Sequence, residues 1–215
     1  MYPKELKDLI ARGESSTLEF KRKVIAPEKL AKELSAFANT VGGYLLIGVD
    51  DDGTIVGIDS EKTDIEFVET VCGFHIHPQL EPQIEMVRVT GREVLVCRIE
   101  ESDDKPHIVN AMFEGKEKKI AYIRVGEKSV AASREMMRLL SGQNKSAKPL
   151  TLSISDKERR LFTYLEKYEK ATVKDFAKLV NISDRRAERL MVRLCRAGVL
   201  QIHVDSSSDF FTLVG

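Results

Sequence analysis

The hydrophobic pattern of residues 27–39 predicts an amphipathic helix. Leu30, Leu34 and Phe37 recur at i, i+4 and i+7, which places them on one apolar stripe. Pro27 suits the first turn of a helix, because the N–H group that proline lacks has no intrahelical partner there. We therefore expect this helix to pack one face against a core.

The segment that follows predicts a buried strand. Residues 44–49 form a continuous apolar run of strand length, so we expect the strand to be covered on both faces. Gly42 and Gly43 precede it and allow a tight corner. The Asp-Asp-Asp-Gly sequence at 50–53 predicts a turn, and residues 54–58 are then the expected returning arm of a hairpin.

The remaining pattern up to residue 142 mixes helices and strands. Gly91-Arg92 is the expected two-residue connection of a hairpin, because glycine comes first as a type II′ turn prefers. The polar stretch 101–119 is expected to be a loop. Helices are expected at 3–12, 60–74 and 133–142, and strands at 17–23, 84–90, 93–100 and 120–125.

The period of the pattern changes after a polar, proline-containing stretch at 141–155. Three helices are expected at 156–169, 173–180 and 183–197, followed by paired strands at 199–204 and 210–214. Three helices and a hairpin in this order are typical of a winged helix-turn-helix. The sequence thus predicts an α+β chain: a mixed α/β domain at 1–142, a linker at 143–154 and a small winged-helix domain at 155–215.

Composition changes this interpretation little. The formal charge of the whole chain is zero, but residues 149–215 carry 12 Lys and Arg against 9 Asp and Glu. This mild asymmetry does not by itself indicate nucleic acid. The sequence contains no Gly-x4-Gly-Lys-Ser/Thr motif and no arrangement typical of a Ser or Cys nucleophile, so neither an ATPase nor a hydrolase of that kind is indicated.

The cysteines are expected to be reduced core thiols, since they are three in number and no Cys-x-x-Cys pair occurs. A zinc set of Cys72, His75, His77 and Cys97 is conceivable, but its spacing is not a recognised one. The N-terminal residues do not resemble a signal peptide, and no apolar run approaches the length that spans a bilayer. We therefore expect a cytoplasmic, soluble protein.

Three ordered blocks carry a resemblance to a known family. They are ESSTLEFKRK at 14–23, LSAFANTVGGYLLIGVDDDGTIVGI at 34–58 and AYIRVGEKSVAASREMMRLL at 121–140. Together they resemble the Schlafen AlbA-like domain over roughly residues 5–140. The resemblance implies a nucleic-acid partner, and it leaves open whether this chain only binds nucleic acid or also cuts it.

An acidic cluster is the candidate catalytic site. Glu14 lies just before the strand of Glu19, Lys21 shares the face of Glu19, and Asp51 follows the central strand. The resemblance to Schlafen-type endoribonucleases implies that Glu14, Glu19 and Asp51 are metal ligands, with Lys21 near the scissile phosphate. Mg²⁺ or Mn²⁺ would be the metal, because hard cations take oxygen ligands.

A structural interpretation of the same residues stands beside the catalytic one. Glu19 can pair with Lys21 or Arg22 on an exposed strand, and the aspartates can simply form a turn. The resemblance also implies that the nuclease branch has two tandem repeats, which form a basic channel, and a zinc site. This chain has one repeat and no matching cluster, so a channel would require a homodimer.

Basic residues offer two candidate surfaces for nucleic acid. In the first domain Arg124 is the strongest candidate. It belongs to the third family-like block, and strand alternation places it on the same face as Tyr122. In the second domain the arginines of the helix 183–197 lie at spacings of 4, 4 and 3 and form one basic edge. The expected contacts are Lys21, Arg22, Lys23, Lys116, Lys118, Lys119, Arg124 and Lys128, then Arg185, Arg186, Arg189, Arg193 and Arg196.

The function that these observations predict is a nucleic-acid-binding protein, a DNA-binding transcriptional regulator that uses the winged helix and a basic AlbA-like surface. It needs no cofactor, binds DNA with RNA as a second possibility, and forms a homodimer through the AlbA-like domain. The alternative is a metal-dependent endonuclease, so the sequence does not decide whether the chain is an enzyme. A third possibility is a first domain that senses a ligand and a second that transmits the signal.

Overall fold

The computed structural model describes residues 1–23, 26–113, 116–143, 154–205 and 207–214. Side chains are described for all of these residues except those at 111–117. The chain is an α+β protein that divides into two compact units, Met1–Ala131 and Ala132–Gly215. No helix among these described residues is long and apolar enough to cross a membrane. The expected linker at 143–154 lies almost entirely outside the described residues.

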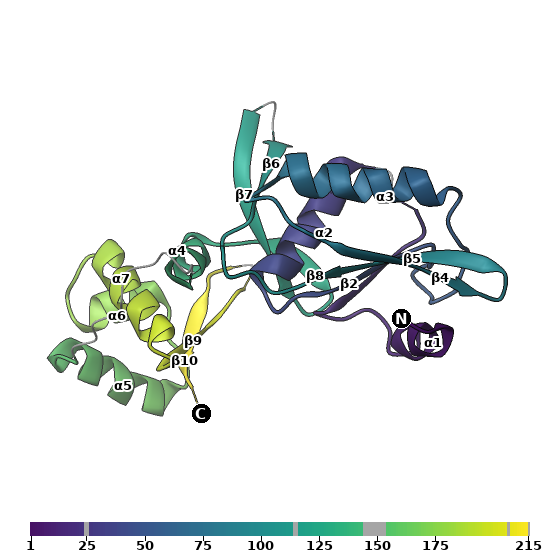
Figure 1. The fold of residues 1–215 in the computed structure, drawn as a ribbon. Helices are drawn as coiled ribbons and strands as arrows, with labels where there is room; N and C mark the ends of the chain where they lie inside the picture. The colour runs from purple at the N-terminus through teal and green to yellow at the C-terminus, as the bar shows by residue number, and fades with distance from the viewer. Residues whose placement is uncertain (24–25, 114–115, 144–153, 206, 215) are drawn as a thin grey trace. The chain divides into compact units, whose positions relative to one another are not determined.

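The first unit is built on a four-stranded sheet of order β1-β2-β5-β4 (Figure 1). β1 and β2 are parallel, and the other neighbours are antiparallel. The strands are β1 (Leu18–Lys21), β2 (Gly43–Ile47), β4 (Gln83–Val89) and β5 (Arg92–Ile99).

Helices cover both faces of this sheet. Helices α2 (Pro27–Asn39) and α3 (Glu61–Thr70) lie on one face, and α1 (Pro3–Ile10) lies on the other (Figure 1). Successive residues of β2 point to opposite faces, so Leu45 joins the core under α2 while Leu46 joins the core beside α1. The prediction of a strand buried on both sides is therefore confirmed.

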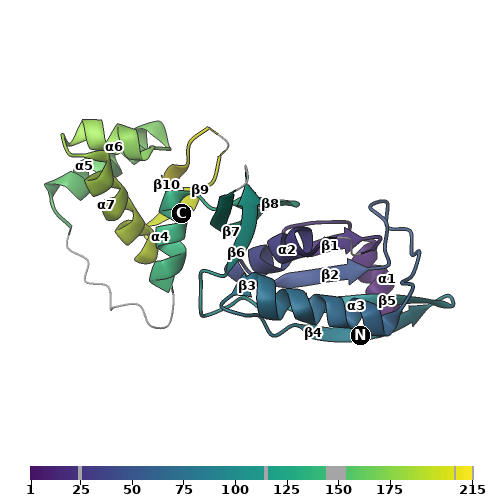
Figure 2. The same ribbon diagram turned by 90° about the horizontal axis from the view of Figure 1, so that it is seen from above.

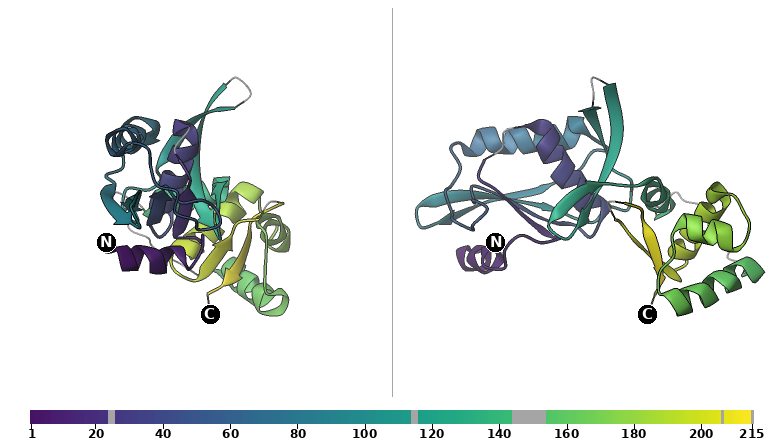
Figure 3. Two further views of the ribbon diagram at one scale, coloured as in Figure 1. Left: turned by 90° about the vertical axis from the view of Figure 1, so that its right-hand side faces the viewer. Right: turned by 180° about the vertical axis from the view of Figure 1, so that it is seen from behind.

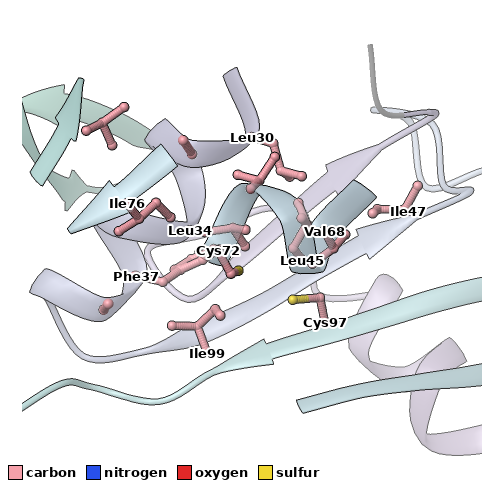
Figure 4. Packing of buried hydrophobic residues seen from close by; sticks show 14 of the residues in the cluster. Leu30, Leu34, Phe37, Leu45, Ile47, Val68, Cys72, Ile76, Cys97 and Ile99 are labelled. Atoms are coloured by element: carbon pink, nitrogen blue, oxygen red, sulfur yellow. The ribbon is translucent and has the colours of Figure 1, made fainter. Parts of the chain in front are cut away.

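The core under α2 is contiguous across helix and sheet. Leu34 and Phe37 of the predicted apolar stripe pack with Leu45 and Ile99, and the Cys72 and Cys97 side chains lie in the same cluster (Figure 4). Gly43 is required where the chain enters β2, because a Cβ there would stand only 2.5 Å from the Phe37 ring. Side-chain packing of this density fixes the helix against the strand.

A second four-stranded sheet of order β3-β6-β7-β8 completes the first unit. α2 packs against strands of both sheets, as the view from above shows (Figure 2). A π-helical turn η1 (Val71–His75) leads into this sheet. Its strands are β3 (Ile76–His77), β6 (Ile108–Phe113), β7 (Lys116–Val125) and β8 (Lys128–Ala131).

Several local expectations are wrong. The stretch 101–119 is not a single loop, because β6 and the start of β7 lie within it and pair with each other. Residues 54–58 return along the end of β2 as expected but without forming a regular strand. Val49 and Ile55 make an isolated bridge, and backbone hydrogen bonds join Asp50 to Thr54, and Val56 and Gly57 to Gly48. The β4–β5 connection is Thr90-Gly91 rather than Gly91-Arg92: Val89 pairs with Arg92, and φ is +48° at Thr90 and +82° at Gly91, as in a type I′ turn.

The second unit is a helical region that ends in a small sheet. Its two strands pair antiparallel and lie beside the helices (Figure 3). The buried core gathers Leu161, Phe176, Met191 and Phe211 from four elements. The elements are α4 (Arg134–Gln143), α5 (Asp156–Tyr168), α6 (Val173–Leu179), α7 (Asp184–Arg196), β9 (Leu200–His203) and β10 (Phe210–Leu213).

The boundary between the units differs from the expected one at residue 142. α4 belongs to the second unit, where it packs along α7. The buried Glu188 carboxylate of α7 makes an ion pair with Arg138 and lies 3.8 Å from Arg134. Leu139 and Leu140 of α4 are also buried. A buried carboxylate needs a cationic partner, and α4 supplies it.

Candidate nucleic-acid interface

Arg124 is the centre of a buried polar network in the first unit. Its side chain is 0% exposed, and Nη1 donates to Glu19 Oε2 at 3.0 Å and to Glu33 Oε2 at 2.8 Å. Nη1 also donates to Ser129 Oγ at 3.1 Å, and Nη2 donates to the Ser15 carbonyl at 2.7 Å. One guanidinium thus joins β1, α2, β7 and β8.

The burial of Arg124 overturns the prediction that it contacts a phosphate backbone. Strand alternation does place Arg124 and Tyr122 on one face of β7, but that face packs against α2. The guanidinium lies 4.9 Å from the centroid of the Phe37 ring, which belongs to the core. Phosphate oxygens cannot reach a side chain that its own protein covers completely.

Glu33 is the member of this network that the sequence analysis missed. It lies three residues after Leu30, within the apolar stripe of α2, and it is 9% exposed. Its carboxylate accepts from Arg124 and from the Ser129 hydroxyl. A carboxylate inside an apolar stripe is a signal for a buried cation elsewhere in the chain, because an unpaired buried charge is costly.

Glu19 and Lys21 form the pair that the structural interpretation expected, but on a covered strand. Lys21 Nζ donates to the Glu19 carboxylate and to the Phe20 carbonyl at 2.9 Å. Glu19 is 7% exposed and its second oxygen accepts from Arg124. Both oxygens of this carboxylate therefore already have cationic partners.

Glu14 lies near the other two carboxylates of the predicted metal set. Partial burial is the main cause that raises its pKa, and the charges of Glu19 and Asp51 raise it further. A hydrogen bond from the Phe20 N–H at 2.9 Å and the charge of Lys21 act in the opposite direction. Burial, with a smaller contribution from the neighbouring carboxylates, thus makes Glu14 easier to protonate than an isolated glutamate.

The three carboxylates do not fit a metal ion. Among the described residues, no group of three or more Asp, Glu, His or Cys side chains is arranged so that it could hold one. Glu19 is the limiting member, because Arg124 and Lys21 occupy the positions that a cation would take. We derive no metal-dependent step from this cluster.

The conceivable zinc set does not form either. Burial raises the pKa of the Cys72 thiol to about 12, and it also raises the pKa of Cys97. Among the described residues no group of three or more His, Cys, Asp or Glu side chains is arranged to hold a metal ion, and these four residues are among those described. Figure 4 shows both sulfur atoms inside the hydrophobic cluster, in agreement with the expectation of core thiols.

The exposed cations of the first unit are fewer than the sequence suggested. Arg22 makes an exposed ion pair of 2.6 Å with Asp50, and Lys21 is held by Glu19. Lys23 and Lys128 are exposed and make no hydrogen bond or ion pair with the described residues. Lys118 and Lys119 are exposed on β7, whereas the Lys116 side chain lies outside the described ones.

α7 presents its arginines on one face and its apolar residues on another. Ala187, Met191 and Leu194 enter the core of the second unit, at the i, i+4 and i+7 positions of a buried stripe. The arginines occupy the opposite sector of the helix. The side chains of Arg185, Arg186 and Arg189 are exposed and make no hydrogen bond or ion pair with any described residue.

The C-terminal half of the arginine face is less available. Arg193 and Arg196 are only partly exposed, and neither is without an interaction partner. The charge of Arg193 acts on Glu158, whose burial would raise its pKa but whose hydrogen bonds from Ser155, together with Arg193, lower it overall. The predicted basic edge therefore divides into a free N-terminal part and a C-terminal part that serves the fold.

Comparison with known proteins assigns the first unit to a family. The family described as Schlafen, AlbA_2 matches residues 14–133, more than half of the chain, and the chain belongs to this family. The match ends close to the boundary between the two units. Membership suggests DNA binding, in agreement with the resemblance of the three sequence blocks.

Two solved structures are similar to this chain. The N-terminal domain of a RecG-related protein from Nitrosomonas europaea is 24% identical and covers 62% of this chain and 93% of that domain, with a TM-score of 0.44. The DIP2311 protein from Corynebacterium diphtheriae is 16% identical and covers 92% of this chain, with a TM-score of 0.45. The match spans 34% of the second protein.

Proposed function

We propose that the chain is a DNA-binding transcriptional regulator whose second unit is a winged helix-turn-helix with α7 as its recognition helix. α6 and α7 are joined by a short turn in which the Ile182 N–H donates to the Ala177 carbonyl at 3.0 Å. The β9–β10 ribbon follows α7 directly. This order of elements supports the proposal, and DNA binding agrees with membership in the AlbA_2 family.

The observation that carries the proposal is the set of three exposed arginines in the N-terminal half of α7. Arg185, Arg186 and Arg189 have no partner among the described residues, so they can bind phosphates or base edges without first breaking an internal contact. Arginine is also the side chain that matches guanine edges and phosphate oxygens with two hydrogen bonds. The N-terminal part of a recognition helix is the part that enters the major groove.

Fluorescence anisotropy with labelled duplex DNA tests this proposal. Arg185→Ala combined with Arg189→Ala is expected to weaken binding and to reduce the slope of log affinity against log salt by about two contacts, or roughly 1.8. Arg160→Ala on α5 is the control, because this exposed arginine lies outside α7. Unchanged affinity of the double variant would remove α7 from the interface.

Homodimerisation through the AlbA_2 unit is the second part of the proposal. It rests on the single AlbA-like repeat seen in this sequence. A channel like the one that the resemblance implies for two tandem repeats would need two copies of this chain. Sedimentation equilibrium measures the mass directly. A monomer at the highest attainable concentration, with and without duplex DNA, would rule out this part and leave the role of α7 untouched.

A nuclease remains the weaker candidate, since Glu19, one of the three carboxylates that it requires, is engaged with Arg124 and Lys21. Incubation of the purified protein with duplex DNA and structured RNA, with Mn²⁺ or with EDTA, distinguishes the two functions. The regulator shifts the duplex without cleaving either substrate. Cleavage that requires Mn²⁺ and disappears in Glu19→Gln would instead establish the enzyme.

A further inference from the structure

The first turn of α7 borders a cleft of about 420 Å³ in the second unit. The first turns of α4 and α6 and the loop between β9 and β10 form its other walls. Three helices each contribute one cation, namely Arg134, Lys174 and Arg185. Five carboxylates also line the cleft, so its formal charge is negative. We therefore do not expect it to bind a free anion.

The basic side of the cleft extends the arginine face of α7 onto α6. Lys174 is exposed in the first turn of α6 and, like Arg185, makes no hydrogen bond or ion pair with the described residues. Both side chains line the same cleft. Lys178 is exposed one turn further along α6. The first helix of a helix-turn-helix crosses the DNA backbone, where lysines of this kind meet phosphates.

The β9–β10 loop forms another wall of the cleft, and it is acidic. The sequence between His203 and Phe210 contains two aspartates and neither lysine nor arginine. Asp205 Oδ1 accepts from the Ser207 N–H at 2.9 Å and from its hydroxyl at 2.8 Å. The Asp209 carboxylate accepts from the Ser133 hydroxyl. These bonds hold both carboxylates in place at the wall of the cleft.

Such a loop cannot serve as a second grip on the backbone. A phosphate bound by Arg185 and Lys174 would lie at the same cleft as Asp205 and Asp209, and like charges repel unless salt screens them. A wing that holds DNA would need basic residues in this loop. The basic and acidic residues that line this cleft therefore have opposite effects on a bound phosphate.

We propose that duplex DNA is held by α6 and α7, with Lys174 as a further phosphate contact, and that the acidic β9–β10 loop weakens binding instead of supporting it. This inference rests on the proposed function of α7 and adds the surface that accompanies it. The partner it fits is the phosphate backbone of a duplex on the α6 side of the recognition helix.

Two variants of the full chain test the proposal with opposite signs. Lys174→Ala is expected to weaken duplex binding and to lower the salt slope by about 0.9, the value of one phosphate contact. Asp205→Asn combined with Asp209→Asn is expected to strengthen binding several-fold at about 50 mM salt and much less at about 200 mM. Asparagine keeps one acceptor oxygen at each position, for Ser207 and for Ser133, and gives up the long hydrogen bond of 3.4 Å from the Asp205 N–H to Asp209.

Matched controls separate local from general charge effects. Glu166→Gln with Glu169→Gln removes the same two negative charges from exposed positions at the end of α5 that do not line the cleft, and it should leave affinity nearly unchanged. Circular dichroism and thermal melting confirm that each variant is folded. Arg160→Ala again controls for the loss of one positive charge.

The outcomes distinguish this inference from the function on which it rests. If the Arg185/Arg189 variant weakens binding while Lys174→Ala does not, or while the double asparagine variant also weakens it, the inference is overturned and the role of α7 stands. If the Arg185/Arg189 variant has no effect, the proposed function fails first. If the Asp205/Asp209 variant and the Glu166/Glu169 control raise affinity by the same factor, the effect comes from net charge and the proposed role of the loop is also overturned.

Discussion

Arg124 joins four elements of the first unit, β1, α2, β7 and β8, through one side chain. Its two carboxylate partners, Glu19 and Glu33, are 105 and 91 residues away in the sequence. A single buried guanidinium between two carboxylates is sensitive to the loss of any member, because the remaining charges stay buried without compensation. We therefore place Arg124 in the stability of the domain and not in its interface.

Arg124→Ala is expected to lower the free energy of unfolding by about 3–5 kcal/mol, since Glu19 and Glu33 would remain buried without their shared cation. Urea denaturation measures the change. Lys128→Ala, at an exposed position on the neighbouring strand, should stay within about 0.5 kcal/mol. If both substitutions change the free energy of unfolding by the same small amount, Arg124 is not a stabilising buried residue, and its predicted role as a surface cation is restored.

His107 is the buried titratable group with the clearest consequence for pH dependence. The ring lies 2.7 Å from the Pro78 carbonyl at Nδ1 and 2.6 Å from Ser102 Oγ at Nε2. A carbonyl can only accept, so Nδ1 donates and the Ser102 hydroxyl can donate to Nε2 of the neutral ring. Burial lowers the pKa of His107, which means that the folded protein disfavours the charged ring.

The sign of the pH effect follows from this lowered pKa. The unfolded chain protonates His107 near its ordinary value of about 6.5, before the folded protein does. The contribution to stability is therefore complete above about pH 6.5 and is lost as pH falls through the folded pKa. Urea denaturation between about pH 7.5 and 5 should show this loss, and His107→Gln should flatten it; identical profiles for both proteins would remove His107 as the cause.

At the scale of elements, the sequence predicted those structures whose pattern is local. The apolar stripe of α2 and the continuous run of β2 were placed correctly because periodicity and length define them. β6 was missed because its apolar residues stand within a polar stretch, and only pairing with β7 makes them a strand. The β4–β5 turn was predicted one residue too late. Thr90 occupies its first position with a positive φ, which threonine rarely adopts, so the sequence did not indicate it.

The candidate sites divide in the same way. Helical spacing located the arginine face of α7, and the structure separates its free part from its engaged part. Strand alternation placed Arg124 on one face of β7 but could not tell which face is covered, since that depends on a helix far away in the sequence. Lys174 carried no signal of its own, and only the cleft beside Arg185 singles it out.

At the scale of the whole molecule, α4 changes the domain organisation that composition had indicated. The polar segment at 141–155 indicated a domain boundary after this helix. The boundary in the structure lies before the helix, where only Ala132 and Ser133 separate the last strand of the first unit from α4. A sequence signal for the actual arrangement exists in Glu188, which lies among the apolar positions Ala187, Met191 and Val192. A buried acid at such a position requires a cation from outside α7.

This arrangement predicts different stabilities for two fragments of the second unit. Residues 132–215 should fold more stably than residues 155–215, because the shorter fragment exposes the surface that α4 covers and leaves Glu188 without Arg138. The burial of Leu140 alone is worth up to about 1.5–3 kcal/mol. Thermal melting of both fragments, with circular dichroism as the signal, measures the difference.

Glu188→Gln sharpens this test because its effect should reverse between the two fragments. In residues 132–215 the substitution removes the partner of Arg138 and should destabilise the fragment by about 1–3 kcal/mol. In residues 155–215 it removes a carboxylate that has lost its cation, and it should leave stability unchanged or raise it. If both fragments melt alike and respond alike to Glu188→Gln, α4 does not belong to the second unit, and the boundary near residue 142 that composition indicated is restored.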